Sequence, residues 1–209
     1  MRGIRRSIGA AKVRKAPVVA EIARAMAQAT PPTLRGLRDR ALLLLGFAGA
    51  FRRSELVALD VADFEETEDR LRVVIRRSKT DQEGQGATIA IARGTVACPV
   101  KALRAWLQAA GITEGPLFRP VRKGGAVRPL RLYDKNVAAI VKRYACGLGL
   151  DAADFSGHSL RAGFLTSAAS RGASIFKMRD VSRHKSMDVL QAYVRDADLF
   201  RDHAGAGLL

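Results

Sequence analysis

Six side chains along the chain could together cleave a phosphodiester bond without a metal ion. They are, in chain order, Arg52, Lys79, His158, Arg161, His184 and Tyr193. Such a reaction needs a nucleophile, donors for the non-bridging phosphate oxygens, and a group that gives a proton to the leaving 5′ oxygen. Two arginines, a lysine, two histidines and a tyrosine can supply every part. Each residue alone is more typical of surface or packing positions, so the prediction depends on the set and its order.

The spacing of these residues places several of them together on expected helices. Arg52 and Glu55 lie three residues apart on a short helix expected over 52–59, which puts their side chains on one face. His158 and Arg161 have the same spacing near the start of another expected helix. The N-terminal end of a helix is a natural anion site. His158 and Arg161 could therefore face a phosphate, whereas the Arg52–Glu55 spacing alone is weak evidence.

No metal site or cofactor motif accompanies these residues. The sequence contains no carboxylate cluster of the kind that holds two metal ions in nucleases. The three histidines, at 158, 184 and 203, lack the spacing and the companion ligands of a zinc site. Gly84 and Gly86 belong to a loop and not to a dinucleotide-binding fingerprint. We therefore expect neither a metal nor a cofactor.

The charge balance predicts a polyanionic partner. Lys and Arg number 36 against 20 acidic residues, for a formal net charge of +16. Such an excess favours nucleic acid, and we expect double-stranded DNA. The longest apolar stretch, at 41–50, is about half of the ~20 residues that a membrane span needs, so no membrane partner is expected. The two cysteines, Cys98 and Cys146, form no C-x-x-C motif and fit a reducing, cytoplasmic setting.

Further basic residues flank the proposed chemistry and are candidates for contacts to DNA. They lie in the expected hairpin, in the loop at 119–131 and directly before His184. The candidates are Arg76, Arg77, Arg122, Lys123, Arg128, Arg131 and Arg183. A basic stretch at 1–16 is typical of an arm or interdomain linker and adds to this charge.

The pattern of apolar residues predicts a mainly helical α+β domain with one small antiparallel sheet. Ala and Leu dominate the apolar set, which favours helices. A β-branched stretch at 71–76 and another at 87–91 predict a hairpin, with Lys79 where it turns. Helices are expected at 17–29, 34–48, 52–59, 99–110, 133–146, 158–170, 174–180 and 186–195. We divide the chain into the arm at 1–16, a catalytic domain at 17–196 and a tail at 197–209.

Four stretches of this sequence, in this order, resemble the tyrosine recombinase or phage integrase family. They are GAFRRSELVAL at Gly49–Leu59, RRSKT at Arg76–Thr80, GHSLRAGFLTSAA at Gly157–Ala169 and RHKSMDVLQAY at Arg183–Tyr193. The resemblance runs from about Leu37 to Arg195. It implies the α+β catalytic domain of that family, and an enzyme that cuts and rejoins DNA through a 3′-phosphotyrosyl intermediate.

The resemblance also implies a role for each residue. Arg52 resembles the first catalytic arginine, with Glu55 as its supporting acid. Lys79 resembles the hairpin lysine that protonates the leaving oxygen. His158 and Arg161 resemble the family's His-x-x-Arg pair.

The last two positions of the resemblance are His184 and Tyr193. His184 matches the second histidine, which contacts the phosphate, and Tyr193 matches the nucleophile. The family usually has Leu-Gly before this histidine, whereas the present chain has Ser182-Arg183. Arg183 could add a phosphate contact or alter how the turn packs.

The resemblance leaves alternatives open. A type IB topoisomerase uses a similar set but religates the same strand, and a non-catalytic DNA-binding module would share the charge without the ordered residues. Members of the family usually carry a core-binding domain before the catalytic one, and we expect it to be absent here. We expect a monomer in solution and a homotetramer on paired DNA sites, with Leu199 and Phe200 of the tail docking on a neighbour.

Overall fold

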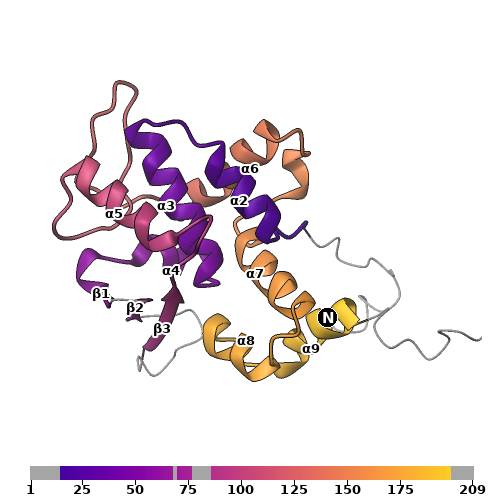
Figure 1. Ribbon diagram of the computed structural model, residues 1–209. Coiled ribbons are helices and arrows are strands. Elements are labelled where there is room, and N and C mark those ends of the chain that lie inside the picture. Colours follow the sequence, from indigo (N-terminus) through magenta and orange to yellow (C-terminus); the bar gives the residue numbers. More distant parts are fainter. Residues whose placement is uncertain (1–14, 68–69, 77–85, 199–209) are drawn as a thin grey trace, which may run out of the picture.

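The computed structural model describes residues 15–67, 70–76 and 86–198. Within them the chain is mainly helical, with one small sheet (Figure 1), which confirms the predicted fold class. The helices are α2 (Ala20–Gln28), α3 (Leu34–Ala48), α4 (Arg53–Ala58), α5 (Pro99–Ala110), α6 (Asp134–Gly147), α7 (Ser159–Ser170), α8 (Ile175–Ser182) and α9 (Met187–Asp198). Short 3-10 helices cover Val61–Asp63 and Ala152–Asp154.

The sheet has three antiparallel strands in the order β1 (Phe64–Glu66), β2 (Arg70–Ile75) and β3 (Ala87–Ala92). Val73 of β2 pairs with both Phe64 and Ile89. Burial alternates along β2 because successive side chains point to opposite faces. The predicted hairpin is therefore present.

The edge strand β1 was not predicted, because its sequence is acidic and short. The carboxylate of Glu65 lies 3.4 Å from Arg72, and that of Glu66 lies 2.8 Å from Arg93. Charged residues are common on edge strands, where they discourage pairing with another chain. Ion pairs with Arg72 of β2 and with Arg93, which directly follows β3, thus accompany this acidic strand.

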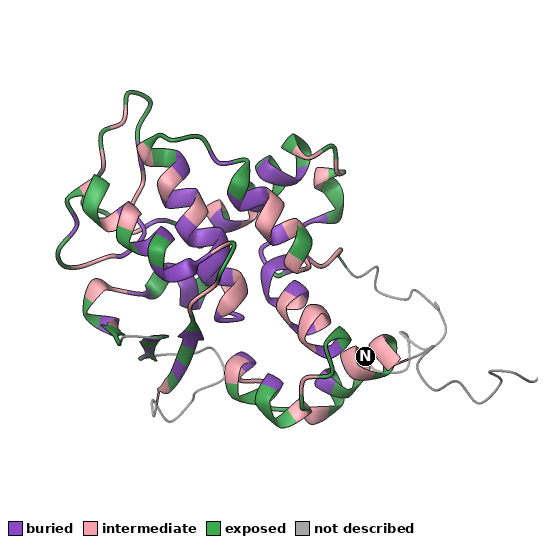
Figure 2. Cartoon of the chain, viewed as in Figure 1, coloured by how far each residue is buried: buried purple, intermediate pink, exposed green. Residues whose placement is uncertain are grey.

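The main hydrophobic core surrounds α3. Leu42, Leu43 and Leu45 are completely buried on this helix, because α2, α5 and α7 cover it from several sides (Figure 2). The Thr33 hydroxyl caps the helix by accepting the Gly36 N–H at 3.2 Å. Trp106 of α5 is also fully buried, and its indole Nε1 donates to the Leu117 carbonyl at 2.9 Å. Leu56 and Val57 anchor α4 in this core.

A second, smaller hydrophobic cluster joins α7, α8 and α9. Its buried members are Leu165, Ala169, Met178 and Leu190. Leu160 at the start of α7 belongs to the main core, so α7 spans both clusters. In Figure 1, α8 and α9 lie at the end of α7 that extends away from the main body. The elements that carry the last predicted site residues therefore pack on α7 as a distinct layer.

Candidate active site

Glu55 lies at the centre of the candidate site, where α4 begins. Its carboxylate oxygen Oε1 is 2.5 Å from Arg52 Nη1, and Oε2 accepts the Arg52 backbone N–H at 2.9 Å. Glu55 is only 2% exposed. Burial alone would raise its pKa, but the charge of Arg183 and the hydrogen bonds from Arg52 lower the pKa overall. The site is therefore built on a buried, ionised carboxylate.

The turn before Arg52 has an unusual backbone that turns a carbonyl toward the site. A Cβ atom on Gly49 would lie 2.2 Å from the Phe51 ring, so a larger residue cannot fit there without a shift. Ala50 follows with a positive φ of 44°, which few non-glycine residues adopt. Its carbonyl accepts a 2.6 Å hydrogen bond from Arg161 Nη1. The turn thus fixes Arg161 beside Arg52.

Arg161 is buried among other cations. It is 6% exposed. Burial, followed by repulsion from Arg52 and Arg183, lowers its pKa to about 9, while Glu55 and Tyr193 act in the opposite direction. The guanidinium remains protonated at neutral pH, and an incoming anion would relieve the repulsion.

His184 lies against Arg161 at the turn between α8 and α9. Its Nδ1 is 3.1 Å from Arg161 Nη2 and 2.9 Å from the hydroxyl of the fully buried Ser182. Arg161 Nη2 also lies 3.4 Å from Nε2. A guanidinium can only donate, and both its shorter contact and the Ser182 hydroxyl face Nδ1, so we assign Nδ1 as the acceptor and the ring proton to Nε2. Burial, and then the charges of Arg161, Arg52 and Arg183, lower the pKa of His184 to about 4. The ring is neutral at pH 7.

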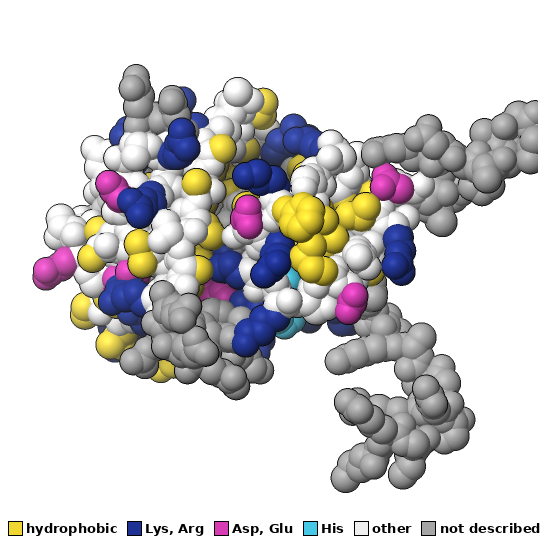
Figure 3. All heavy atoms as spheres, turned by 90° about the horizontal axis from the view of Figure 1, so that it is seen from below, with side chains coloured by type: hydrophobic (Ala, Val, Ile, Leu, Met, Phe, Trp, Pro, Cys, Tyr) yellow, Lys and Arg dark blue, Asp and Glu magenta, His cyan; other side chains and the backbone are white. Residues whose placement is uncertain are grey.

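Tyr193 and His158 line one cavity of about 840 Å³ between α7 and α9. His158 is exposed and is the N-cap residue of α7, which agrees with its predicted position near the start of a helix. Tyr193 is half-buried against the second cluster. Its phenol lies near enough to Arg161 to raise the pKa of that guanidinium. On the face drawn in Figure 3, a visible histidine lies beside Lys and Arg side chains.

Arg183 points into the protein. Its side chain is 10% exposed, and its Nη2 lies 2.8 Å from Glu55 Oε2. Its guanidinium carbon lies 5.3 Å from the centre of the Phe51 ring. The structure thus places this DNA-contact candidate inside the site, beneath the turn that precedes Arg52.

Two other DNA-contact candidates are paired with carboxylates. Arg76 Nε lies 2.6 Å from Asp63, and its Nη2 lies 2.8 Å from Asp60, which raises the pKa of Arg76. Arg131 Nη2 lies 2.6 Å from the other oxygen of Asp60, and its Nη1 donates to the Val57 carbonyl at 2.8 Å. These arginines tie β2 and the 119–131 loop to the end of α4. A role in binding DNA remains a prediction for both.

The remaining candidates divide into exposed residues and residues beyond the described part. Arg122, Lys123 and Arg128 are exposed on the loop between α5 and α6. An isolated antiparallel bridge between Val121 and Val127 closes this loop, which projects from the body in Figure 1. Lys79 and Arg77 lie outside the described residues, as do Leu199 and Phe200.

Comparison with known sequences identifies the family. The profile of the phage integrase family matches residues 18–199. The chain belongs to the phage integrase family. An integrase/recombinase xerD homolog of Selenomonas ruminantium is 42% identical over 207 residues, which are 98% of this chain and 61% of that protein. A tyrosine recombinase XerD of Xanthomonas axonopodis pv. citri is 32% identical over 77% of this chain and 52% of its own length. The chain thus spans only about half to three-fifths of these relatives.

Solved structures share the integrase fold. A XerH site-specific recombinase bound to a palindromic difH substrate matches with a TM-score of 0.72 at 14% identity, over 94% of this chain and 54% of that one. A XerA recombinase matches with a TM-score of 0.68 at 18% identity, over 93% of this chain and 66% of that one. At such low identity these matches show the fold alone. They agree with the mainly helical architecture and its small sheet.

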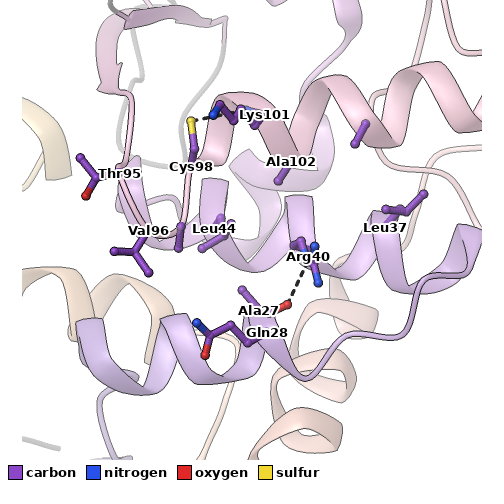
Figure 4. Close-up of a pocket in the computed structure, with 12 residues that line it drawn as sticks. Ala27, Gln28, Leu37, Arg40, Leu44, Thr95, Val96, Cys98, Lys101 and Ala102 are labelled. Carbon is purple, nitrogen blue, oxygen red and sulfur yellow. Dashed lines mark hydrogen bonds between the residues drawn. The ribbon is translucent and has the colours of Figure 1, made fainter.

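A second pocket of the integrase domain contains none of the six predicted catalytic residues. It has a volume of about 400 Å³ and lies between α2, α3 and the start of α5 (Figure 4). Cys98 lies at its edge, where the thiol accepts the Lys101 N–H at 3.5 Å and caps α5.

The described residues include no group of three or more His, Cys, Asp or Glu placed to hold a metal. None of the described helices is long and apolar enough to cross a membrane.

The sequence predicted one supporting contact of the site, that of Glu55 with Arg52, and missed the others. In the sequence, Ser182 and Arg183 stand out only as departures from the family pattern, yet Ser182 contacts His184 and Arg183 contacts Glu55. The hydrogen bond from Arg161 to the Ala50 carbonyl could not be predicted from the sequence, because every residue has a backbone carbonyl. The unusual Ser-Arg pair was the one clue that the sequence offered to the missed contacts.

Proposed function

We propose that this chain is the catalytic domain of a site-specific DNA recombinase or integrase, which cuts and rejoins strands through a 3′-phosphotyrosyl intermediate. One observation carries the proposal. Arg52 pairs with the Glu55 carboxylate, Arg161 donates to the carbonyl of Ala50 two residues before Arg52, and His184 lies against Arg161. Tyr193 lies close enough to affect the charge of Arg161. Family membership supports double-stranded DNA as the partner, as does the fold shared with a XerH recombinase that is bound to its difH substrate.

In this proposal the two arginines bind the non-bridging oxygens of the scissile phosphate. When no anion is bound, burial and mutual repulsion disfavour the charged form of Arg161, and its pKa is lowered as a result. A phosphate restores the balance, and the extra negative charge of the transition state strengthens the same contacts. Neutral His184 adds a hydrogen bond from Nε2–H without adding further positive charge.

Tyr193 supplies the nucleophile. Its phenol oxygen attacks phosphorus and gives its proton to solvent water as the O–P bond forms, and the bond from phosphorus to the 5′ oxygen breaks. Lys79 gives the departing 5′ oxygen its proton. The positive charge of Arg161, which interacts with Tyr193, stabilises negative charge as the reaction proceeds. His158 lines the same cavity as Tyr193 and completes the phosphate-binding set. Attack by a 5′ hydroxyl then reverses the step.

The experiment that tests this function is the capture of a covalent protein–DNA complex. The full chain is incubated with a pool of random-sequence duplexes that carry a nick, so that a short 5′-hydroxyl strand diffuses away after cleavage. A complex that survives SDS and carries DNA 3′ ends is expected. Exchange between two such captured sites distinguishes a recombinase from a topoisomerase. Duplex binding with no covalent complex would instead identify a non-catalytic DNA-binding module.

We extend the proposal to assembly and setting. The chain is a monomer without DNA and a homotetramer on paired sites, acting on cytoplasmic DNA, and the tail at 197–209 docks on a neighbour. The average mass by light scattering, with and without a two-site duplex, tests the assembly. Loss of the residues after Asp198 should leave single-site cleavage intact and reduce paired complexes.

Removal of metal ions should leave the rate of covalent complex formation unchanged. We expect this because Arg52 and Arg161, and not a metal ion, neutralise the phosphate in this proposal. The rate is measured with EDTA and with Mg²⁺, and a magnesium-dependent nuclease in the same buffer shows that chelation is complete. A loss of activity in EDTA that Mg²⁺ restores would argue for a different mechanism.

The affinity for duplex DNA should fall steeply with salt. The exposed loop cations contribute, so we expect the Arg122→Ala/Lys123→Ala/Arg128→Ala variant to have a shallower log–log salt slope, by about 0.9 for each phosphate that these side chains neutralise. Fluorescence anisotropy across a salt series measures the slope. Arg24→Ala is the control, because Arg24 pairs with Glu21 on α2. Equal slopes for the loop variant and the native chain would remove the loop from the interface.

A further inference from the structure

Arg183 occupies a backbone position that favours glycine. It ends α8 in the left-handed region, with φ 57° and ψ 39°. Residues with a Cβ atom rarely adopt this conformation, and glycine is the usual residue at such a helix end. The family pattern also usually has glycine directly before its second histidine, which here is His184. An arginine at this position therefore requires compensation from its side-chain contacts.

Most of those contacts lead to the turn before Arg52 and to Glu55. Nη2 donates to Glu55 Oε2 at 2.8 Å and approaches the Ala50 carbonyl at 3.4 Å. Nη1 donates to the carbonyls of Gly49, at 3.2 Å, and Val181. The Nε atom is buried as well. With its donors turned inward and only 10% of the side chain exposed, Arg183 is poorly placed to bind a DNA phosphate.

Arg183 shares its acceptors with the two arginines that are proposed to bind the phosphate. Glu55 presents Oε1 to Arg52 Nη1 at 2.5 Å and Oε2 to Arg183. The Ala50 carbonyl accepts Arg161 at 2.6 Å beside its weaker contact with Arg183. In addition, Arg52 Nη2 lies 3.5 Å from the Arg183 carbonyl. The buried guanidinium of Arg183 thus contacts the carboxylate that binds Arg52 and the Ala50 carbonyl that binds Arg161.

These bonds also cross between the two hydrophobic clusters. Phe51 and the turn before α4 belong to the main core, whereas α8 and α9 pack on the second cluster with Tyr193. The Arg183 side chain extends from the end of α8 to that turn and lies 5.3 Å from the Phe51 ring centre. It therefore fastens the layer that carries His184 and Tyr193 to the body that carries Arg52.

We propose that Arg183 is a positioning residue that holds Arg52, Arg161 and His184 in register through Glu55 and the Ala50 carbonyl. The inference rests on the recombinase function proposed above. It assigns the unusual Ser182-Arg183 pair a purpose: Ser182 orients the His184 ring, and Arg183 orients the two cations opposite it. Arg183 does not touch the phosphate in this assignment.

Arg183→Gly tests the proposal sharply, because glycine relieves the backbone and removes the guanidinium. If Arg183 served only to end the helix, glycine would preserve the rate. We instead expect the first-order rate of covalent complex formation at saturating DNA to fall by about 10- to 100-fold, as for a small misplacement of catalytic groups, with the DNA affinity unchanged. The probe is a nicked duplex captured by the native chain, and each rate is divided by the folded fraction from thermal unfolding. Arg183→Lys should recover part of the rate.

Two further variants separate positioning from a general effect of charge. Arg179→Ala removes an exposed cation of α8 and should keep the native rate. In a double-mutant cycle, Arg183→Gly should cost much less on a Glu55→Gln background, since both changes break the same contact. A native rate for Arg183→Gly, fully additive losses, or a loss seen only as weaker DNA binding would each overturn the positioning role while leaving the recombinase function intact. No covalent complex from the native chain would overturn both.

Discussion

Tyr193→Phe is expected to abolish the SDS-stable protein–DNA complex and to leave duplex affinity nearly unchanged. The substitution removes the one atom that attacks phosphorus and keeps the ring that packs against the second cluster. The arginines remain, so the phosphate still binds. Covalent capture on a nicked duplex measures the first effect, and fluorescence anisotropy measures the second.

The two other tyrosines provide matched controls. The sequence contains three tyrosines, so three Phe variants cover every candidate of this type. Tyr133 is 75% exposed before α6, and its substitution should change neither measurement. Tyr144 is buried and bonds to Asp39 at 3.1 Å, so its loss should lower thermal stability without removing the covalent complex. A complex that persists in Tyr193→Phe and disappears in another variant would reassign the nucleophile.

Helices could be predicted from the sequence wherever their apolar spacing was strong. Both α3 and α5 have the predicted bounds, because Thr33 caps the first and Pro99 and Gly111 bound the second. The ends of α8 and α9 lie two or three residues beyond the predicted ones. At the end of α8 the chain turns through the left-handed conformation of Arg183, where the sequence has no glycine to mark the end of a helix.

The sequence predicted the Arg52–Glu55 pair of the candidate site, but not the contacts between distant elements. Residue type and order selected Arg52, Arg161 and His184, which the structure brings together, and Tyr193, which affects the charge of Arg161; their catalytic roles remain a prediction. The pKa of about 4 at His184 arises from burial and then from Arg161 and Arg52, which are more than 20 residues away in sequence, as well as from the adjacent Arg183. Spacing within a helix carries no information about such pairs. Arg76 and Arg131 show the converse, because positive charge alone suggested DNA where the structure shows Asp60 as a partner.

Arg161 is the more buried of the two arginines that are proposed to bind the phosphate, with 6% of the residue exposed. Arg161→Ala is expected to lower the rate of covalent complex formation by on the order of 10²–10³, as for the loss of one charge-stabilising donor. Arg52→Ala should have a loss of similar size. The rate is measured in single-turnover reactions at saturating DNA.

Substitution by lysine separates the charge of Arg161 from its shape. Arg161 holds the Ala50 carbonyl with Nη1 and the His184 ring with Nη2, and a lysine has a single nitrogen for both. Arg161→Lys should therefore recover only part of the missing rate, even though the positive charge is retained. Arg24→Ala on α2, which removes a partly exposed arginine, is the control and should retain the native rate. Full recovery with lysine would show that charge alone suffices, and an unchanged rate in Arg161→Ala would remove this residue from the proposed phosphate site.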